Sequence, residues 1–596
     1  MRKAWLSSLC LMLILSFVVS VKEVGAAANE VTPIAWSTFT AAAPTDADTA
    51  RIRSILVNSN KYALTEWYPT VKNYDAQTGT YLSFGGTAED NIRPSASEAI
   101  ALAASLKLGA YDAAVTGVSV SSATAIANKL ISSLAYQHAA NTSGGWGNHW
   151  QSALWASLAG TAGWLMWDDL SVTDREYVRK MVEYEANRFN TYTVPYYRNA
   201  SGTIVIAGDS KGEENSWNAM ILQLATSMMP NHPNYLTWMN KNVELMLSAF
   251  ARPSDVTNNT IINGKSVATW IKGSNINEDG TMVNHNIIHP DYMATAIQNG
   301  NAALLYTLAG KATPSAALFN LDIVYDTMVD LNFTAGTNIP PGGTVAAPGG
   351  TIFVDGGSDI YYPQGNDWGI GRRMNFAHLD AQARALGYDT LASQKGAYWE
   401  PYHAQKVLDM QTRYTDGHTY SGNSEDTYGG REEWVAQHAG RAFLTKWISA
   451  QNKYTLTNEA PSMEIIVDNS DGGVTKSSGW LSSSTSSLRI GSDYLQDGNT
   501  NKGALNATFT PVLPVTGTYS VYVYYNAAAN RANNVPFTIT HASGTASVGV
   551  NQQINGGTWV QLGTYTFNSG STGSVTISNT GTSGYVIADA VKFVKQ

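Results

Sequence analysis

Two histidines four residues apart, followed closely by a tyrosine, form the segment with the clearest potential for proton transfer. Residues 277–292 read NEDGTMVNHNIIHPDY and contain His285, His289 and Tyr292, in a chain with only ten histidines. A neighbouring histidine and tyrosine suit removal of a proton from carbon and its delivery to a leaving oxygen. Structural loop histidines are one alternative. Zinc is another, but no strong third ligand is evident, so we predict no metal and no cofactor.

Two further segments carry groups that bind carboxylates. Residues 211–218 (KGEENSWN) place Asn215 at a helix start, where free N–H groups and the helix dipole favour an anion. Residues 366–373 (NDWGIGRR) place Arg372 and Arg373 after a glycine-rich loop, and arginine binds carboxylates through paired hydrogen bonds. We expect these three residues to neutralise an acidic substrate. Helix capping by Asn215 and surface salt bridges of the arginines are the alternatives.

Aromatic and amide side chains cluster near the same segments, in a pattern typical of sugar binding. Residues 145–151 read GWGNHWQ and open a helix. Aromatic rings stack on the apolar faces of sugars, and amide and imidazole groups bond their hydroxyls. A purely structural role is the alternative, and we prefer it for the tryptophans deeper in that helix. The predicted substrate-binding residues are Trp146, Asn148, His149, Trp150, Trp217, His289 and Trp368.

Helices are expected to position all of these residues. Apolar residues recur at helical spacing from about residue 50 to 453. About a dozen short helices in sequential pairs suggest an α/α toroid with a cleft at one end; a helical solenoid is the alternative, but no fixed-period repeat is present. The Gly- and Pro-rich stretch Thr334–Gly365 is expected to lie near the cleft mouth. The predicted helices are Ser95–Leu108, Ser121–Gln137, Asn148–Leu170, Thr173–Phe189, Asn215–Met229, Pro233–Phe250, Tyr292–Leu308, Ala316–Leu331, Arg373–Leu386 and Glu432–Ala450.

The composition changes sharply near residue 462, and the rest of the chain is rich in Ser, Thr, Gly and Val with alternating apolar residues. This pattern predicts a small β-sandwich. The expected organisation is a multidomain protein: a signal peptide at 1–28, an all-α toroid at 29–454, a linker at 455–462 and a β-sandwich at 463–596. The predicted strands are Tyr519–Tyr525, Phe537–Thr540, Trp559–Phe567, Gly573–Ser578 and Val586–Val594.

The beginning of the chain indicates export. Arg2 and Lys3 precede the apolar stretch Ala4–Val19, and small residues follow at Ala26–Ala28. We therefore expect a secreted protein, with a retained anchor as the alternative. The one cysteine, Cys10, lies in this segment, so no disulfide is expected after cleavage.

The charge balance bears on partners. The net charge is −9 and no basic tract is present, so nucleic acid and membranes are not expected partners. A local cationic cleft could still bind an acidic polysaccharide, and we expect a monomer.

Two resemblances extend this interpretation. EIIVDNSDGGVTKSSG (464–479), GTYSVYVYYN (517–526) and YVIADAVKFV (585–594) resemble the golvesin C-terminal-like domain, a module often appended to secreted xanthan lyases. That resemblance implies association with carbohydrate or cell wall.

The second resemblance covers residues 145–373. In order, the Asn/Trp-rich helix start, DDLS (168–171), Asn215, DGTMVNH (279–285) with Tyr292, and the paired arginines resemble the helical domain of the hyaluronate, chondroitin and xanthan lyases, polysaccharide lyase family 8. The large β-sandwich that follows the helices in that family is absent here. A separate α/α-toroid lyase family with the same site logic is the alternative.

The sequence therefore predicts a lyase that cleaves a uronic-acid polysaccharide by β-elimination. Asn215 with Arg372 or Arg373 would neutralise the carboxylate, and His285 or Tyr292 would move the proton, with His289 as the rival of His285. One alternative is a glycoside hydrolase with paired carboxylates. Another is a non-catalytic carbohydrate-binding wall protein. The candidate hydrolase carboxylates are Glu213, Glu214, Glu278, Asp279 and Asp367.

Overall fold

The computed structural model describes residues 31–335 and 348–596. The predicted signal peptide and residues 336–347 of the Gly- and Pro-rich stretch lie outside this range. Contacts divide the chain into two compact units, one ending at Met463 and the other beginning at Glu464. In the part of the chain that the structure describes, no helix is long and apolar enough to cross a membrane.

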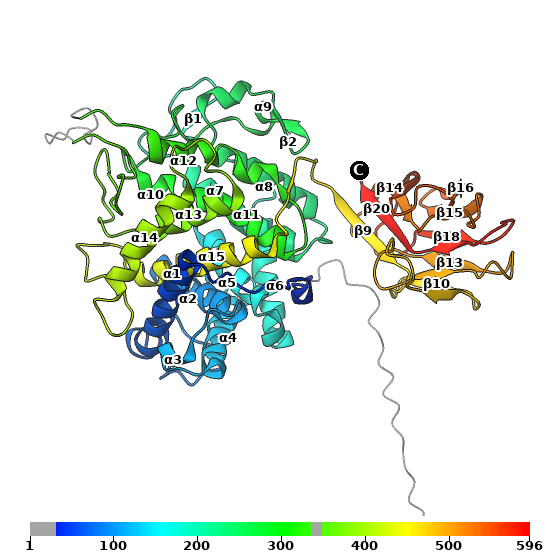
Figure 1. The fold of residues 1–596 in the computed structure, drawn as a ribbon, viewed down its shortest axis with the longest axis horizontal. Coiled ribbons are helices and arrows are strands. Elements are labelled where there is room, and N and C mark those ends of the chain that lie inside the picture. Colours follow the sequence, from blue (N-terminus) through cyan, green and yellow to red (C-terminus); the bar gives the residue numbers. More distant parts are fainter. Residues whose placement is uncertain (1–30, 336–347) are drawn as a thin grey trace, which may run out of the picture. The chain divides into compact units, whose positions relative to one another are not determined.

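The first unit is helical (Figure 1). Its elements alternate along the chain between an inner and an outer set of helices. The inner set is α2 (Glu89–Lys107), α5 (Ser152–Leu165), α7 (Gly212–Met228), α11 (Ala296–Leu308), α13 (Met374–Leu386) and α15 (Arg431–Gln451). The outer set is α1 (Ala47–Tyr62), α4 (Val120–Tyr136), α6 (Val172–Asn187), α8 (Tyr235–Ala249), α12 (Leu321–Asp330) and α14 (Gly396–Gln411).

The inner helices close into a ring. Each packs against the next, and α15 packs against α2 to complete the circle. Outer helices cover the ring: α4 lies on α2 and α5, α6 on α5 and α7, α8 on α7, α14 on α13, and α1 on α15. The outer α12 is tied to α13 by the Tyr325 hydroxyl, which donates to Asp380 at 2.8 Å.

Burial of the inner helices explains their composition. Every residue of α5 and of α11 is buried, and apolar or small residues occur on all faces of both helices, although α11 also buries Gln298, Asn299 and Asn301. A helix that is covered all round shows no single apolar stripe. Small residues allow close packing: Gly160 of α5 leaves no room for a Cβ, which would lie 2.7 Å from Leu224 and Val182.

Short elements between the helices carry the functional loops. They are α3 (Ala113–Thr116), α9 (Val267–Trp270), α10 (Pro290–Met293), and the strand pairs β1 (Arg198–Asn199) with β4 (Gly273–Ser274), β2 (Ile261–Ile262) with β3 (Lys265–Ser266), and β5 (Val283–Asn284) with β6 (Ile287–Ile288). Residues 348–365 fold back onto the core. Ile352 and Phe353 are fully buried there, and the Phe353 amide donates to Met328 O at 2.9 Å.

The segment predicted as a linker is held by the helical unit. It contains β8 (Leu456–Thr457), which pairs in parallel with β7 (Thr313–Pro314). The Asn263 side chain donates to the carbonyls of Thr457 and Glu459 at 2.9 and 3.1 Å.

The second unit is a β-sandwich. Five strands lie in the order β10-β13-β18-β15-β16, four in the order β17-β14-β20-β9 and three in the order β11-β12-β19. Apolar residues alternate inward, as in β15, where Val535, Phe537 and Ile539 are fully buried. The prediction of a helical domain followed by a β-sandwich is confirmed. The strand bounds are β9 (Met463–Asp468), β10 (Val474–Lys476), β11 (Leu481–Ser483), β12 (Tyr494–Gln496), β13 (Asn506–Phe509), β14 (Gly517–Tyr524), β15 (Val535–His541), β16 (Gly544–Val550), β17 (Val560–Phe567), β18 (Ser574–Ser578), β19 (Ile587–Ala588) and β20 (Ala590–Lys595).

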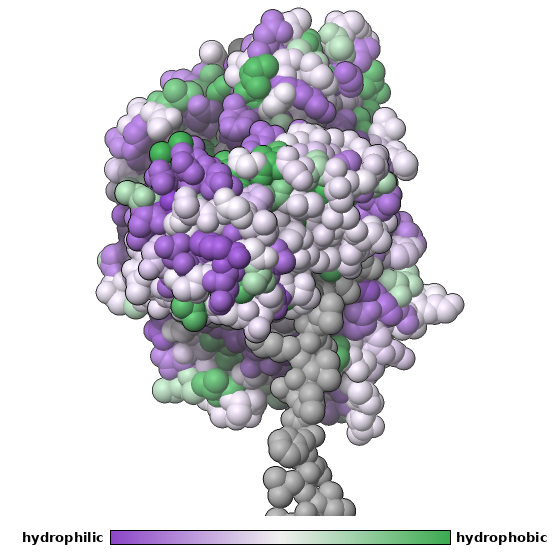
Figure 2. Space-filling view, turned by 90° about the vertical axis from the view of Figure 1, so that its right-hand side faces the viewer, coloured by the Kyte–Doolittle hydropathy of each residue, from purple (hydrophilic) through white to green (hydrophobic). Residues whose placement is uncertain are grey.

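The surface view in Figure 2 is mostly pale or hydrophilic, with hydrophobic residues in small groups. The exposed large apolar residues of the second unit are few and separated in sequence: Ile466, Leu481, Leu488 and Ile554. Scattered apolar residues of this kind are ordinary on a protein surface.

Candidate active site

A cavity of about 380 Å³ lies at one end of the inner ring. Residues in or just before the first turns of all six inner helices line it, so the N-terminal ends of these helices face the same space. Such ends carry free N–H groups and positive potential, which favour an anionic ligand. The lining includes Glu89, Asp90, Arg93, Trp150, Gln151, Glu213, Trp217, His285, Asp291, Tyr292, Gln298, Trp368, Arg372, Asn375, Tyr428, Trp434 and His438.

A second hollow of about 430 Å³ adjoins the first. The two share Trp150, Glu213, His285 and Tyr292. These four residues therefore lie where the hollows meet, with room for ligand groups on both sides. The combined space is of the size that protein ligand sites commonly have.

His285 occupies a strained turn. It and Asn286 form the two-residue connection between β5 and β6, and both have positive φ, 51° and 65°. Two positive φ values are typical of the type I′ turns that close two-residue hairpins. Histidine adopts this conformation less readily than glycine, and strain of this kind concentrates at functional sites.

The hairpin turn is seated on the segment before α7. The Asn286 amide donates to Gly208 O at 2.9 Å, and the Ser210 amide donates to Val283 O at 2.9 Å. A Cβ on Gly208 would lie 1.9 Å from Asn286 Oδ1, so only glycine permits this approach. Gly208 thus helps to fix the position of His285.

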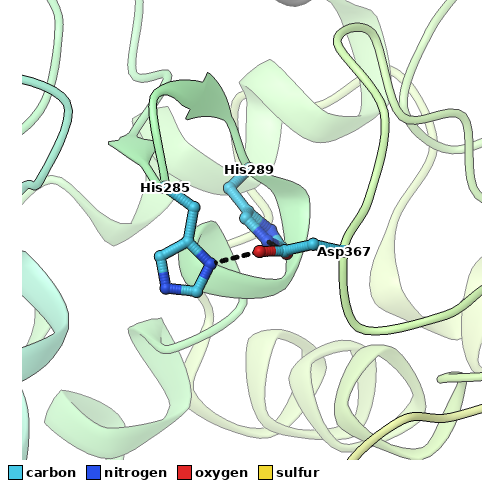
Figure 3. Close-up of side chains that lie close together, drawn as sticks. All are labelled: His285, His289 and Asp367. Carbon is cyan, nitrogen blue, oxygen red and sulfur yellow. Dashed lines mark hydrogen bonds and ion pairs between the residues drawn. The ribbon is translucent and has the colours of Figure 1, made fainter.

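Asp367 joins the two histidines of the hairpin. Its carboxylate lies between them, 2.6 Å from His285 Nδ1 and 3.0 Å from His289 Nε2 (Figure 3). These hydrogen bonds, the one from His289 first, hold the pKa of Asp367 well below its ordinary value. Asp367 is therefore an ionised acceptor, and both facing histidine nitrogens carry hydrogen.

The proton on His285 Nδ1 leaves Nε2 as an acceptor. That atom lies 3.1 Å from the Tyr292 hydroxyl, so Asp367, His285 and Tyr292 form one hydrogen-bonded chain that ends in the cavity. Burial, and then the charge of Glu213, raise the pKa of Tyr292 far above its ordinary value. The hydroxyl thus needs an adjacent acceptor to lose its proton.

The same cluster offers three metal-ligand atoms, from His285, His289 and Asp367, within 4.8 Å of one another. Without a metal these atoms already satisfy one another by hydrogen bonds. A histidine that binds metal usually donates its other ring N–H to an acceptor, but the buried Nδ1 of His289 has no such acceptor within residues 31–335 and 348–596. The local contacts therefore favour a hydrogen-bonded cluster over a metal centre.

Glu213 is a neutral acid in the cavity wall. Burial raises its pKa to about 8, although the charge of Arg93 acts in the opposite direction. At neutral pH its carboxyl group carries a proton and can donate a hydrogen bond to a ligand.

Two arginines line the cavity. The Arg93 guanidinium lies over the rings of Trp217 and Tyr428, at 5.7 and 5.2 Å from their centroids, and donates to Glu89 Oε1 at 2.7 Å. Its buried Nε has no hydrogen-bond partner among the residues that the structure describes.

The second arginine, Arg372, makes a two-point contact with Asp426, at 2.8 and 3.0 Å. It lies between the rings of Trp368 and Trp434, at 4.8 and 5.0 Å from their centroids. Asp426 therefore largely compensates the charge of Arg372, whereas Arg93 keeps one N–H donor that no described residue accepts.

The structure brings several predicted residues together. His285, Tyr292 and Arg372 line the cavity, as do the predicted sugar-binding Trp150, Trp217 and Trp368. The indoles of Trp150 and Trp217 lie 5.4 Å apart at the edge of the cavity, and Trp150 is 53% exposed. His289 is fully buried beneath and reaches the site through Asp367.

The two other predicted carboxylate ligands do not line the cavity. Asn215 is fully buried, and its amide donates to Pro195 O and Ser248 Oγ, both at 3.0 Å. Arg373 donates to the carbonyls of Ser358 and Ile370 at 2.6 and 2.8 Å. Each side chain leaves its helix start in a direction away from the cavity.

Three residues of the 145–151 segment also lie elsewhere. Trp146 is in the core, where its indole donates to Leu134 O at 2.9 Å. Asn148 donates to the Tyr184 hydroxyl at 2.7 Å, and the His149 ring stacks on Trp155 at 4.9 Å. These contacts build the helix entrance that presents Trp150.

Sequence reasoning gave no ligand-binding role to Arg93 and considered Glu213 and Asp367 only as hydrolase carboxylates. A charged residue near the start of an otherwise buried helix was the signal for Arg93, in the segment EDNIRPSASE (89–98). For Asp367 the signal was its place beside Trp368 after a glycine-rich loop. Arg93, Glu213 and Asp367 come together only because the inner helices close into a ring, and the sequence does not show this closure.

Comparisons with known proteins concern the second unit. Residues 465–595 match the model of the Golvesin C-terminal domain, so the predicted resemblance of this part is confirmed. A xanthan lyase from Bacillus sp. (strain GL1) is 49% identical over 140 residues, which are 23% of this chain and 15% of that enzyme. The match lies in the C-terminal region, and the chain thus spans a small part of that relative's length.

The similar solved structures also cover only about a quarter of this chain. A Paenibacillus xanthan lyase is 51% identical over 24% of this chain and 14% of its own chain, with a TM-score of 0.23. A family 35 carbohydrate-binding module from Clostridium thermocellum is 15% identical and covers 22% of this chain and 96% of that module, with a TM-score of 0.19.

Proposed function

We propose that the chain is a secreted polysaccharide lyase that cleaves a uronic-acid-containing polysaccharide by β-elimination. In this proposal the helical unit carries the reaction, and residues 464–596 form a carbohydrate-associated module. The sequence similarity of that module to part of a xanthan lyase supports a polysaccharide substrate. The signal-peptide pattern at residues 1–28 supports export.

One observation carries the proposal: the chain of hydrogen bonds from Asp367 through His285 to the Tyr292 hydroxyl at the cavity wall. In it, His285 Nε2 accepts the tyrosine proton, and Asp367 stabilises the imidazolium that results. The phenolate oxygen of Tyr292 is then the base that takes the proton from C5 of the uronate. Burial alone would keep this tyrosine protonated, so the histidine is required.

In the elimination, the bond that breaks and the double bond that forms both lie in the substrate. The C5–H electron pair forms the C4–C5 double bond, the C4–O bond breaks, and the leaving oxygen takes a proton. Tyr292, which has just gained the C5 proton, is placed to deliver it. His285 then returns its own proton to the Tyr292 phenolate, which restores the starting state, and no water is consumed.

Neutralising the uronate carboxylate is the second requirement, because the C5 proton is only weakly acidic beside an ionised carboxylate. Glu213 and Arg93 replace the predicted Asn215 and Arg373 in this role. Protonated Glu213 offers a hydrogen-bond donor, and Arg93 offers a charge and a buried donor without a partner. The inner-helix N-termini add positive potential around them.

The shape of the site supports a polymer rather than a small acid. Tyr292 and Glu213 lie where two adjoining hollows meet, so a sugar can lie on each side of the bond that breaks. The adjacent indoles of Trp150 and Trp217 offer apolar faces for sugar rings.

A screen of uronate polysaccharides, read by ultraviolet absorbance, tests the proposal. A lyase leaves an unsaturated uronate that absorbs, and a hydrolase does not. New absorbance with glucuronate polymers is the expected result. New reducing ends without absorbance would instead support a hydrolase, and binding without any product would support a non-catalytic carbohydrate-binding protein.

A glycoside hydrolase remains the second candidate because of Glu213. A buried carboxylic acid with a pKa near 8 is suited to protonate a glycosidic oxygen. Two of the other proposed hydrolase carboxylates, Glu278 and Asp367, fit less well. Glu278 accepts from Ser254 outside the cavity, and Asp367 is tied to two histidines.

A further inference from the structure

Arg441 is a buried cation that forms no ion pair with another described residue. It lies on α15 and is 1% exposed, and its Nε and Nη2 have no hydrogen-bond partner in the part of the chain that the structure describes. Among the ion pairs of residues 31–335 and 348–596, none includes Arg441. Burial lowers its pKa to about 9, which still leaves it charged at neutral pH.

Arg441 lies on the same helix as a residue that lines the cavity. Arg441 follows His438 by one helical turn, and His438 lines the cavity. His438 Nδ1 is 3.1 Å from Nδ1 of His378, which is fully buried. Burial, and then the charge of Arg441, lower the pKa of both histidines, so neither adds a charge of its own.

Arg441 differs from the other arginines around His438. Arg93 and Arg372 also act on the pKa of His438, but each has a carboxylate partner, Glu89 or Asp426. An unpaired buried charge is destabilising, and a buried polar group without a partner calls for an explanation. His438, one turn before Arg441 on the same face of α15, lines the cavity, so a counter-charge in the cavity would lie on the side of the helix that carries Arg441.

We propose that Arg441 is an electrostatic specificity residue whose counter-charge is the carboxylate of the bound sugar. The inference rests on the proposed function for the identity of that sugar as a uronate. Arg441 does not touch the substrate; it acts across His438, where the protein interior screens charge weakly. A neutral sugar of the same shape leaves the arginine uncompensated, so the cavity discriminates against it.

Two variants test this inference in the full-length chain. Arg441→Met removes the charge and keeps the length of the side chain, whereas Arg441→Lys keeps the charge. Arg179→Met is the matched control, because Arg179 lies on the outer helix α6 and pairs with Glu176 and Glu183. Thermal unfolding is measured without ligand, and with D-glucuronate or D-glucose at matched ionic strength.

The expected pattern has two parts. Without ligand, Arg441→Met unfolds at a higher temperature than the wild type, because an uncompensated charge is gone. The wild type and Arg441→Lys are stabilised more by glucuronate than by glucose, and Arg441→Met loses most of that difference. Arg179→Met keeps it. On polymer, Arg441→Met raises KM at least tenfold with a smaller change in kcat.

A purely structural arginine gives the opposite pattern. If Arg441→Met lowers the unfolding temperature and keeps the preference for glucuronate, or if the wild type shows no preference, the inference is overturned. The lyase proposal is judged separately. A preference lost in Arg441→Met without any unsaturated product keeps the role of Arg441 and rejects the lyase, and unsaturated product at unchanged KM does the reverse.

Discussion

Asp367 holds the ring of His285 by a 2.6 Å hydrogen bond to Nδ1, and this bond decides which nitrogen faces Tyr292. Because a carboxylate only accepts, the proton must lie on Nδ1 and the lone pair on Nε2. The Asp367 carboxylate thus keeps His285 Nε2 free to accept the proton of the Tyr292 hydroxyl. In the proposed mechanism, Asp367, His285 and Tyr292 each have one role, and a single substitution can remove it.

Asp367→Asn is expected to change the tautomer of the His285 imidazole. An amide can donate to Nδ1, which places the proton on Nε2 and removes the acceptor for the Tyr292 hydroxyl. We expect turnover to fall by about 10²–10⁴-fold, with KM changed little. Steady-state assays of unsaturated product measure the effect. Activity close to that of the wild type would exclude a role for Asp367 in fixing the tautomer.

Tyr292→Phe is expected to lower turnover by about 10²–10⁴-fold, since it removes the proposed base and acid while keeping the ring. The unfolding temperature should change little, because the hydroxyl lies at the cavity wall and its hydrogen-bond partner there is the exposed side chain of His285. Product assays and thermal unfolding are compared on the same preparation. Near-normal turnover in a folded variant would end the assignment.

Glu213→Gln tests the pH dependence. With a pKa raised to about 8 by burial, Glu213 is protonated and able to donate below that pH, and it loses this ability as the pH rises through about 8. Activity of the wild type should therefore decline on the alkaline side through a rise in KM. Glutamine keeps a donor at every pH and should remove this decline. The surface variant Glu176→Gln should retain it.

Gly208→Ala is expected to displace the hairpin turn that carries His285. The added methyl group would meet Asn286 at 1.9 Å, and the positive φ of 69° adds backbone strain. Because a shift of about 1 Å at a reacting group can cost about 10²-fold, we expect a loss of that order in kcat/KM. Gly202→Ala has a similar φ of 83° and open space around it, so it reproduces the strain without the clash. Equal losses in both variants would refute the positional argument.

Asp589→Asn tests the stability of the second unit. Burial raises the pKa of Asp589 to about 7, above the ordinary value near 4 of the unfolded chain. Between these two values the unfolded state releases a proton that the folded state retains, so stability falls as the pH rises from about 4 to about 7. The asparagine variant should lose less stability across that window. Thermal unfolding at several pH values measures this, and identical slopes would contradict it.

Helix positions were predictable from the sequence, since apolar spacing marks an element regardless of its partners. The predicted Ser121–Gln137 corresponds to α4 (Val120–Tyr136), and Arg373–Leu386 to α13 (Met374–Leu386). Two outer helices, α1 and α14, were not specified. In the second unit the alternation of inward and outward residues marked β14, β15, β17 and β18, and one predicted segment that contains β19 and most of β20, whereas β9 to β13 and β16 were not specified.

The inward face of a fully buried helix was not predictable. In α7 both Glu213 and Asn215 lie near the start, yet two residues along a helix turn a side chain by about 200°. Glu213 faces the cavity and Asn215 faces α8. The same holds for Arg372 and Arg373, which are adjacent and diverge. Burial on all sides leaves no polar stripe to mark which of such neighbours meets the ligand.

Because the inner helices form a closed ring, the site is assembled from separate segments, one from the start of each helix. Each helix contributes a few residues from its opening turns, while the remaining turns hold the barrel together. Exchange of one opening segment would therefore alter one wall of the cleft and leave the scaffold intact. Under the proposed function, exchange of such segments between barrels of this kind is expected to change which sugar binds, provided that Asp367, His285 and Tyr292 are kept.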